Sequence, residues 1–532
     1  YGWAALCGFA ALYALNQYLC HSQYSQLTSP ETSPHTSPSD QSSRIYPWPL
    51  LAIQASLNLA FILTSLWLWV TQTWWPELSK LQQLQASGAQ LSFDLSILEL
   101  RNWAPIGHQN YVAGYLLLAI PLLAGLALTQ VGWQRWLWVT ATGLGLVDLY
   151  TTNSRGGWLG LLVAVTVVGS LWLWQRQRWL IGVGLVPIAI GLVFVNERLR
   201  GAIVTLLRGQ SSGELAFRAI NTVVGWRIGL DHPWLGAGLG SVPLLYQRYR
   251  PIWAGREAEL AYQLHSTPIQ LWAELGLWGV VTAVSVFLML AYLSLRSLRQ
   301  HHPLTISLLS GLLAYSVMAL TDYQLDNLSI SGTIVLYVAL LASQYREQAP
   351  KLAGTTIDLT PSSNHRHLAP KLALATVALL IAASLWLWPI HYAWSLSSQG
   401  FAALNRQDFT TFSQRLEQAQ RWAPWEPYYP NQLGWVVGNV GLETKDPKAI
   451  QVGIRALQRS LAVAPDQEFA STNLGWLLMT QDPQTAMGAF LRSAQLAPAK
   501  RGIFYRLGMS LIAQGKTNLA ITAFTLELLR DP

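Results

Sequence analysis

The residues best suited to chemistry in this sequence are a histidine and several arginines that lie beside apolar stretches. His265 stands where a long polar stretch ends and an apolar stretch begins, directly before the Ser-Thr-Pro sequence at 266–268. Ser and Thr cap helix N-termini and Pro fits the first helical turn, so this pattern predicts a helix that begins just after His265. A neutral imidazole at that position can accept the proton of a hydroxyl group.

A second candidate is the polar turn at residues 151–156, which reads Thr-Thr-Asn-Ser-Arg-Gly between two apolar stretches. Glycine lets the backbone approach a ligand closely, and a guanidinium can bind a phosphate through two hydrogen bonds. We therefore expect Arg155 to bind a phosphate group of a ligand, with Asn153, Ser154 and Gly156 beside that ligand. The alternative is that Arg155 only reaches toward lipid headgroups.

The polar stretch at 196–267 is long for a connection between membrane helices, which predicts a functional loop. Its glycine-rich segment 236–240 is not expected to bind phosphate, because no strand precedes it and no Lys-Ser/Thr follows. The many arginines of the loop suit an anionic substrate or anionic lipid headgroups. They are Arg198, Arg200, Arg208, Arg218, Arg227, Arg248, Arg250 and Arg256.

Carboxylates form two further candidates. Glu274 lies about 9 Å below the start of the helix predicted after His265, at about 1.5 Å rise per residue. At that depth it needs a partner such as an arginine, or it stays protonated. The turn from Asp322 to Asp326 is the nearest approach to a metal site, but a solvated turn is the expected structure. No His or Asp cluster has metal-ligand spacing, so the sequence favours chemistry without a metal.

The composition indicates which fold positions these residues. Hydrophobic residues make up 52% of the 532 residues and charged residues 11%, whereas about a quarter of a soluble protein is charged. Ten stretches of about 17 residues or more could each cross a bilayer, which predicts an all-α, polytopic transmembrane helix bundle. They lie near 1–20, 48–72, 111–131, 136–152, 156–174, 179–195, 268–295, 303–321, 328–344 and 371–391.

The charge distribution predicts the topology. Most Lys and Arg lie in short loops, so the formal charge of +8 orients helices and does not indicate nucleic acid as a partner. If the Ser-Pro-rich loop at 22–47, which we expect to be disordered, is cytoplasmic, so are Arg135, the turn at 175–178, Arg296 with Arg299, and the loop at 345–370. The opposite side then receives 73–110, 151–156, 196–267, 322–326 and everything after about 392.

The ends of the sequence carry less information about chemistry. The chain begins at Tyr1 within an apolar run and without Met, which is compatible with further helices ahead of it. Cys7 and Cys20 are the only cysteines, so neither a disulfide framework nor a cysteine-based metal site is expected.

Residues 392–532 differ from the rest because amphipathic, helix-length patterns replace apolar spans. Ala-Pro recurs at 423, 464 and 497, and Leu-Gly recurs at 433, 474 and 507. The second step, near 34 residues, resembles tetratricopeptide repeats. We expect a soluble domain of at least three helical repeats after a transmembrane domain at 1–391.

Three motifs together resemble the O-antigen ligase and Wzy polymerase superfamily of membrane glycosyltransferases. They are Ser154-Arg155-Gly156, Arg218 followed by the Asp-His-Pro-Trp-Leu-Gly-Ala-Gly-Leu-Gly sequence at 231–240, and His265 with Leu271, Glu274, Gly276 and Gly279. The resemblance covers about residues 50–343. The sequence departs from the family at Ser266, where Asn is frequent, and at Thr222, where an aromatic Trp is usual.

The resemblance implies a GT-C-like glycosyltransferase of the bacterial inner membrane. Such ligases move a glycan from undecaprenyl diphosphate to a sugar hydroxyl of lipid A core, on the periplasmic side, without a metal, another cofactor or a nucleotide sugar. Arg155 and Arg218 would stabilise charge on the diphosphate, and His265 would orient or deprotonate the hydroxyl, with inversion at the anomeric carbon. Arg227 and Glu274 would contact the substrate. The repeats could bind a protein or a glycan.

Three other interpretations stay open. In a polysaccharide polymerase the acceptor would be another carrier-linked glycan. Some cyanobacterial relatives with the same His and Arg pattern are regarded as inorganic-carbon (bicarbonate) transporters, which usually place charges near the midplane on broken helices. A scaffold built on the repeats would leave the Arg and His pattern unexplained.

Overall fold

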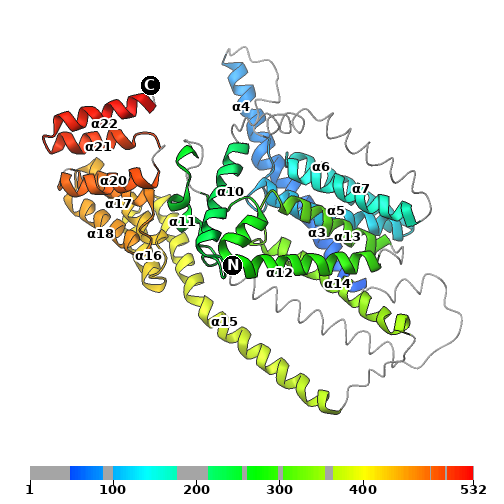
Figure 1. Cartoon of the computed structure of the whole chain (residues 1–532). Helices are drawn as coiled ribbons and strands as arrows, with labels where there is room; N and C mark the ends of the chain where they lie inside the picture. Colours follow the sequence, from blue (N-terminus) through cyan, green and yellow to red (C-terminus); the bar gives the residue numbers. More distant parts are fainter. Residues whose placement is uncertain are drawn as a thin grey trace.

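The computed structural model describes residues 48–87, 100–175, 214–254, 261–297, 303–353, 363–479, 481–497 and 500–530 (Figure 1). These residues form helices and connecting turns, with no strand among them. The predicted all-α helix bundle is thereby confirmed. The predicted spans at 1–20 and 179–195 and the loop at 22–47 lie outside the described residues.

The membrane part and the loop beside it contain most of the longer helices. Several of the predicted spans agree with these helices to within a few residues. The helices are α3 (Trp48–Trp69), the π-helix η1 (Val70–Trp74), α4 (Trp75–Ala86), α5 (Gln109–Thr129), α6 (Gly132–Thr151), α7 (Arg155–Gln175), α10 (Glu214–Asp231), α11 (Val242–Tyr249), the 3-10 helix η3 (Ile252–Ala254), α12 (Thr267–Ser297), α13 (Pro303–Ala319), α14 (Leu328–Ala353) and α15 (Ser363–Leu404).

Helix α5 is the centre of the bundle. Its sequence is apolar on every face. In its most apolar part, 83% is buried, and α5 packs against α3, α6, α7, α13 and α14. Glycines let the neighbouring backbones approach closely. A Cβ atom added to Gly160 of α7 would lie only 2.5 Å from the carbonyl oxygen of Ala314 in α13. This packing places the ends of α5, α7 and α13 next to one another.

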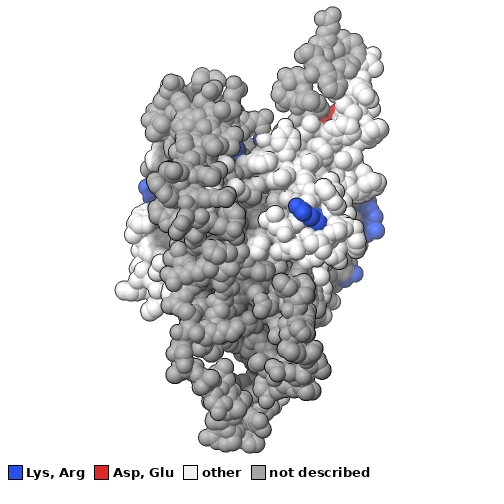
Figure 2. All heavy atoms as spheres, turned by 90° about the vertical axis from the view of Figure 1, so that its right-hand side faces the viewer, with Lys and Arg blue, Asp and Glu red and all other residues white. Residues whose placement is uncertain are grey.

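Four segments among the described residues are long and apolar enough to cross a membrane: 50–83, 109–129, 267–292 and 377–404. The stretches at 155–171, 303–319 and 328–342 are apolar but shorter. Only 11% of the most apolar part of α12 and 12% of that of α15 are buried. This exposure suits helices that face lipid. Figure 2 shows one face of the molecule, where the described surface is mostly uncharged with a few scattered Lys and Arg.

Helix α12 is broken at Gly276, whereas the sequence predicted a continuous span at 268–295. Gly276 has φ 62° and ψ −152°, a conformation open essentially to glycine alone. The freed backbone groups pair with the segment 233–240. The amides of Ala237 and Gly238 donate to the carbonyls of residues 273 and 274, and the amide of Leu277 donates to the carbonyl of Pro233. The break is therefore filled by protein.

The segments that the charge pattern predicts on one side of the membrane meet at one end of the bundle. The amide of Asn102 donates to the carbonyl of Thr151 at 2.9 Å. Arg218 of α10 donates to the carbonyl of Thr321 at 3.0 Å. The stretch predicted as a long loop contains α10 and α11, which share a small core around Ile228 and Tyr246. This end of the bundle holds most of the candidate residues.

After the membrane part, helical hairpins stack one upon another, as Figure 1 shows at the left. Gly434, Gly475 and Gly508 each lie where the first helix of a hairpin crosses the second, against Leu457, Phe490 and Phe524. This crossing explains the recurring Leu-Gly sequence. The helices are α16 (Phe409–Trp422), α17 (Tyr428–Thr444), α18 (Pro447–Val463), α19 (Glu468–Leu478), α20 (Pro483–Leu496), α21 (Ile503–Ala513) and α22 (Thr517–Arg530).

Two features connect this stack to the rest of the chain. Helix α15 runs without interruption through residue 391, the boundary expected from the sequence, and its final turns pack with α16 and α17 through Ala393 and Leu396. The loop before α19 contacts α11. Arg248 lies 3.8 Å from Asp466, and the side chain of Gln467 donates to the carbonyl of Pro243 at 3.2 Å.

Candidate functional site

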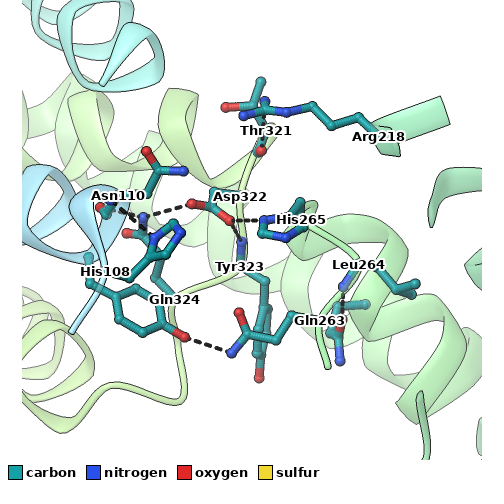
Figure 3. A network of polar contacts seen from close by, with 12 residues as sticks. His108, Asn110, Arg218, Gln263, Leu264, His265, Thr321, Asp322, Tyr323 and Gln324 are labelled. Atoms are coloured by element: carbon teal, nitrogen blue, oxygen red, sulfur yellow. Dashed lines mark hydrogen bonds and ion pairs between the residues drawn. The ribbon is translucent and has the colours of Figure 1, made fainter. Parts of the chain in front are cut away.

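The centre of the candidate site is a contact between His265 and Asp322 (Figure 3). His265 precedes α12 in the left-handed conformation, with φ 50°. Its Nδ1 lies 2.9 Å from Oδ1 of Asp322, in the turn between α13 and α14. Thr267 Oγ1 donates to the carbonyl of Asp322 at 2.9 Å. The start of α12 is therefore tied to this turn at two points.

Asp322 is ionised at neutral pH, and this decides the tautomer of His265. Burial opposes ionisation of Asp322, which is 3% exposed, but the hydrogen bond and the charge of His265 and the amide of Tyr323 outweigh it and lower the pKa of the carboxyl. An ionised carboxylate only accepts hydrogen bonds. Nδ1 of His265 is therefore the donor, and in the neutral ring Nε2 carries the basic lone pair. The side chain of His265 is 27% exposed.

A chain of hydrogen bonds extends from Asp322 to the start of α7. Gln324 Nε2 lies 3.3 Å from Asp322 Oδ2 and donates to the carbonyl of Asn110 at 2.6 Å. Ser154 Oγ donates to Asn110 Oδ1 at 3.0 Å and accepts the amide of Gly157 at 3.2 Å. Ser154 is thus the N-cap of α7. The predicted polar turn and His265 belong to one network.

The two predicted arginines approach the same turn from different helices. Arg218 reaches the carbonyl of Thr321, the residue before Asp322. Arg155 is the first residue of α7 and is exposed. The next residue, Gly156, lies so close that an added Cβ would be 3.2 Å from Thr321 Oγ1. Thr321 is therefore the point where the segments that carry both arginines come together.

Three other residues predicted to contact the substrate differ from the arginines at Thr321 in their position or in their exposure. Arg227 is exposed, about 13 Å further along α10 than Arg218 at about 1.5 Å rise per residue, and donates to the carbonyl of Tyr249 at 3.4 Å. Asn153 is exposed in the left-handed conformation, with φ 54°. Ser154 is buried, so its hydroxyl supports the turn.

Glu274, for which the sequence predicted either a partner such as an arginine or a protonated carboxyl, has amide groups as partners. It is 1% exposed, and its Oε1 accepts the amide of Gly240 at 2.9 Å and the side chain of Gln270 at 2.8 Å. Gln270 in turn accepts the amide of Leu264 at 2.9 Å. Glu274 therefore connects the glycine-rich turn to the residue before His265. With its amides used in this way, the turn is not a phosphate loop, as expected.

The prediction of a solvated turn at 322–326 is wrong. Asp322, Tyr323 and Gln324 are all buried, because α5, α7 and α12 converge on this turn. Polar residues at the end of an apolar stretch, on the same predicted side as His265, were the signal that could have identified them. The same signal applies to His108 and Asn110 before α5. His108 accepts the amide of Asn110 at 3.2 Å, and its ring centroid lies 6.5 Å from that of His265.

Comparison with known proteins shows that part of this chain is similar to a known family. Residues 140–284 match the family described as O-antigen ligase. This match, together with the apolar helices, supports a membrane protein with a region similar to the O-antigen ligase family. No curated protein matches the sequence.

The match to the O-antigen ligase family covers only part of the site. Arg155, Arg218 and His265 lie within the matched residues, whereas Asn110 and Asp322 lie outside them. The candidate site is therefore assembled from the matched region together with the ends of α5 and α13.

Proposed function

We propose that this protein is a glycosyltransferase of the O-antigen ligase type. It would move a glycan from undecaprenyl diphosphate to a sugar hydroxyl, of lipid A core or a related acceptor, on the periplasmic side of the bacterial inner membrane. The observation that carries the proposal is the contact between His265 and the buried carboxylate of Asp322 beside Arg218. A base fixed by a carboxylate and a nearby cation suits transfer from a lipid-linked diphosphate.

In this reaction His265 is the general base. Asp322 accepts a hydrogen bond from Nδ1–H of His265, so the lone pair of Nε2 can take the proton of the acceptor hydroxyl. The hydroxyl oxygen then bonds to the anomeric carbon, and the bond from that carbon to the phosphate oxygen breaks. Its electron pair remains on the diphosphate. Direct displacement of this kind inverts the anomeric configuration. Asp322 also stabilises the imidazolium that forms.

The charge that develops on the diphosphate would be stabilised by Arg218 and Arg155. Both belong to segments that meet at Thr321. One guanidinium group can bind two phosphate oxygens at once. Arg155 is exposed at the start of α7 and forms no hydrogen bond or ion pair with other residues that the structure describes. Since these cations can neutralise the leaving group, the proposed reaction needs no metal. It needs no nucleotide sugar, because the lipid-linked glycan is itself the donor.

The rest of the chain would serve the same reaction. Exposed Trp226 and Trp234, on and just after α10, suit contact with membrane lipids beside the carrier. Arg227 and Asn153 are exposed and could bind the glycan. Ser154, Gly156 and Glu274 would position the backbone segments that surround the substrate. We place the transmembrane domain at 1–391 and tetratricopeptide-like repeats, extracytoplasmic, at 392–532. The repeats would bind a protein or glycan partner.

Two alternatives remain candidates. A polymerase would use the same centre with a second carrier-linked glycan as acceptor. A bicarbonate transporter is favoured by one observation, the break of α12 at Gly276, because transporters bind ions at discontinuous helices. Two carbonyls of that break, those of residues 273 and 274, and two amides, those of residues 277 and 278, pair with residues 233–238, so the protein itself engages these groups. This pairing supports the transferase over the transporter.

A transfer assay with purified components tests the proposal. The protein in detergent receives a glycan on undecaprenyl diphosphate, a lipid A core acceptor and EDTA. We expect transfer by the wild type and its loss in folded His265→Ala, Arg155→Ala and Arg218→Ala variants. Preference for a carrier-linked acceptor would indicate a polymerase. Absence of transfer to either acceptor, together with bicarbonate uptake by wild-type proteoliposomes that these changes abolish, would contradict the proposal.

A further inference from the structure

Two polar clusters of opposite character lie on either side of the contact between His265 and Asp322. One is the cationic cluster at Thr321, which Arg218 reaches. The other lies at Asp326, four residues further along the same turn. Figure 3 shows Arg218 and Thr321 on one side of His265 and Gln263 on the other. The turn between α13 and α14 thus carries a cationic and an anionic end.

The Asp326 cluster joins three separate segments. Tyr111 of α5 donates its hydroxyl proton to the carboxylate of Asp326, with oxygen distances of 3.1 and 3.0 Å. Gln263, two residues before His265, donates Nε2 to Asp326 Oδ2 at 2.6 Å, and this Nε2 lies 2.6 Å from the hydroxyl oxygen of Tyr111. All three side chains are partly exposed. The carboxylate is therefore held in place and still accessible.

His108 connects this cluster to the reaction centre. Its ring lies 5.8 Å from that of Tyr111 and 6.5 Å from that of His265, measured between ring centroids. It is exposed. A molecule in contact with His265 would therefore have His108, Tyr111 and the Asp326 carboxylate within reach.

The charges decide which substrate belongs on this side. A diphosphate would be repelled by Asp326 and attracted by the arginines on the other side of His265. A neutral sugar is suited to Asp326, because its hydroxyl groups donate to carboxylates and its apolar face packs on aromatic rings. We propose that Asp326, Tyr111 and Gln263, with His108, form the subsite that binds the acceptor sugar. This inference rests on the proposed transferase function.

The kinetic test compares the two substrates separately. The purified protein transfers glycan from undecaprenyl diphosphate to lipid A core, and each substrate is titrated at saturation of the other. For Asp326→Asn and Tyr111→Phe we expect the KM for lipid A core to rise about tenfold, since each change weakens a hydrogen bond to a charged group. The KM for the carrier-linked donor should stay within about twofold.

Tyr249→Phe is the matched control, because it removes a similar phenol-to-carboxylate hydrogen bond of 2.7 Å, made to Asp231 at the end of α10. It should change neither KM. If Asp326→Asn lowers the melting temperature, Tyr111→Phe decides the question. A rise in the donor KM, or unchanged acceptor KM values in both variants, would overturn the subsite and leave the transferase function standing. Absence of wild-type transfer to any acceptor would overturn both.

Discussion

Nδ1 of His265 lies 2.9 Å from Oδ1 of Asp322, although 57 positions of sequence separate the two residues. The contact joins the start of α12 to the turn after α13. It is buried on the carboxylate side and partly exposed on the imidazole side. In the proposed reaction, this contact fixes the tautomer of His265 from within the protein and leaves Nε2 for the acceptor hydroxyl.

The carboxylate of Asp322 should therefore be needed for catalysis. In Asp322→Asn the negative charge that orients the ring and stabilises the imidazolium is lost. We expect kcat for glycan transfer to fall about a hundredfold or more, with little change in the KM for the donor. Steady-state kinetics measures both values. Glu77→Gln, which removes a partly exposed carboxylate paired with Lys80, is the control, and equal activity of the two variants would argue against a role for Asp322.

The same carboxylate should make stability depend on pH in the acid range. The folded-state pKa of Asp322 is lowered, so the stability it contributes is present above its unfolded pKa of about 4 and is lost as the pH falls through the folded value. Asp322→Asn should melt below the wild type at pH 7, and this difference should shrink below about pH 4. Thermal melting in detergent at both pH values measures it. A constant difference would contradict the assignment.

The break in α12 should require glycine. A Cβ atom at Gly276 would lie 2.5 Å from the amide nitrogen of Gly236, and the backbone has a positive φ. We expect Gly276→Ala to reduce stability by about 2 kcal/mol or more. Gly143→Ala is the comparison, because its Cβ would meet nothing within 4 Å in α6, and it should be neutral or stabilising. Similar melting temperatures for both variants would show that the break can be straightened.

The cap of α7 should matter for stability and for donor binding. Ser154→Ala removes the hydroxyl that accepts the amide of Gly157 and donates to Asn110. We expect a loss of about 1–3 kcal/mol and a higher KM for the carrier-linked donor, because Arg155 follows directly. Ser154→Thr should restore much of both. If Ser154→Ala leaves the KM for the donor unchanged, the position of Arg155 does not depend on this cap.

The sequence predicted the helices better than it predicted their connections. Apolar stretches of span length are set by the chain itself, so α5, α7 and α13 lie close to where we expected them. The break at Gly276 was missed because it depends on backbone groups of 233–238, which no local pattern reveals. In the repeats, the recurring Leu-Gly sequence was visible since each glycine meets a side chain of the following helix.

For the site, the residues with unusual chemistry were visible and their partners were not. His265, Arg155 and Arg218 stood out as ionisable groups beside apolar stretches. Asp322 looked like part of a solvated turn because sequence does not show that α5, α7 and α12 bury it. Arg227 resembled Arg218 in the sequence, but about two and a half turns of α10 separate them. Proximity of this kind comes only from tertiary structure.

The most direct test of the central claim is a double-mutant cycle on transfer activity. His265→Ala, Asp322→Asn and the combined variant are compared in kcat with the wild type, using undecaprenyl diphosphate-linked glycan and lipid A core. If Asp322 acts through His265, the combined variant should be no slower than His265→Ala alone, because residues that act as one unit are strongly non-additive. Losses that multiply in the combined variant would show that the two residues act independently and would contradict the proposed centre.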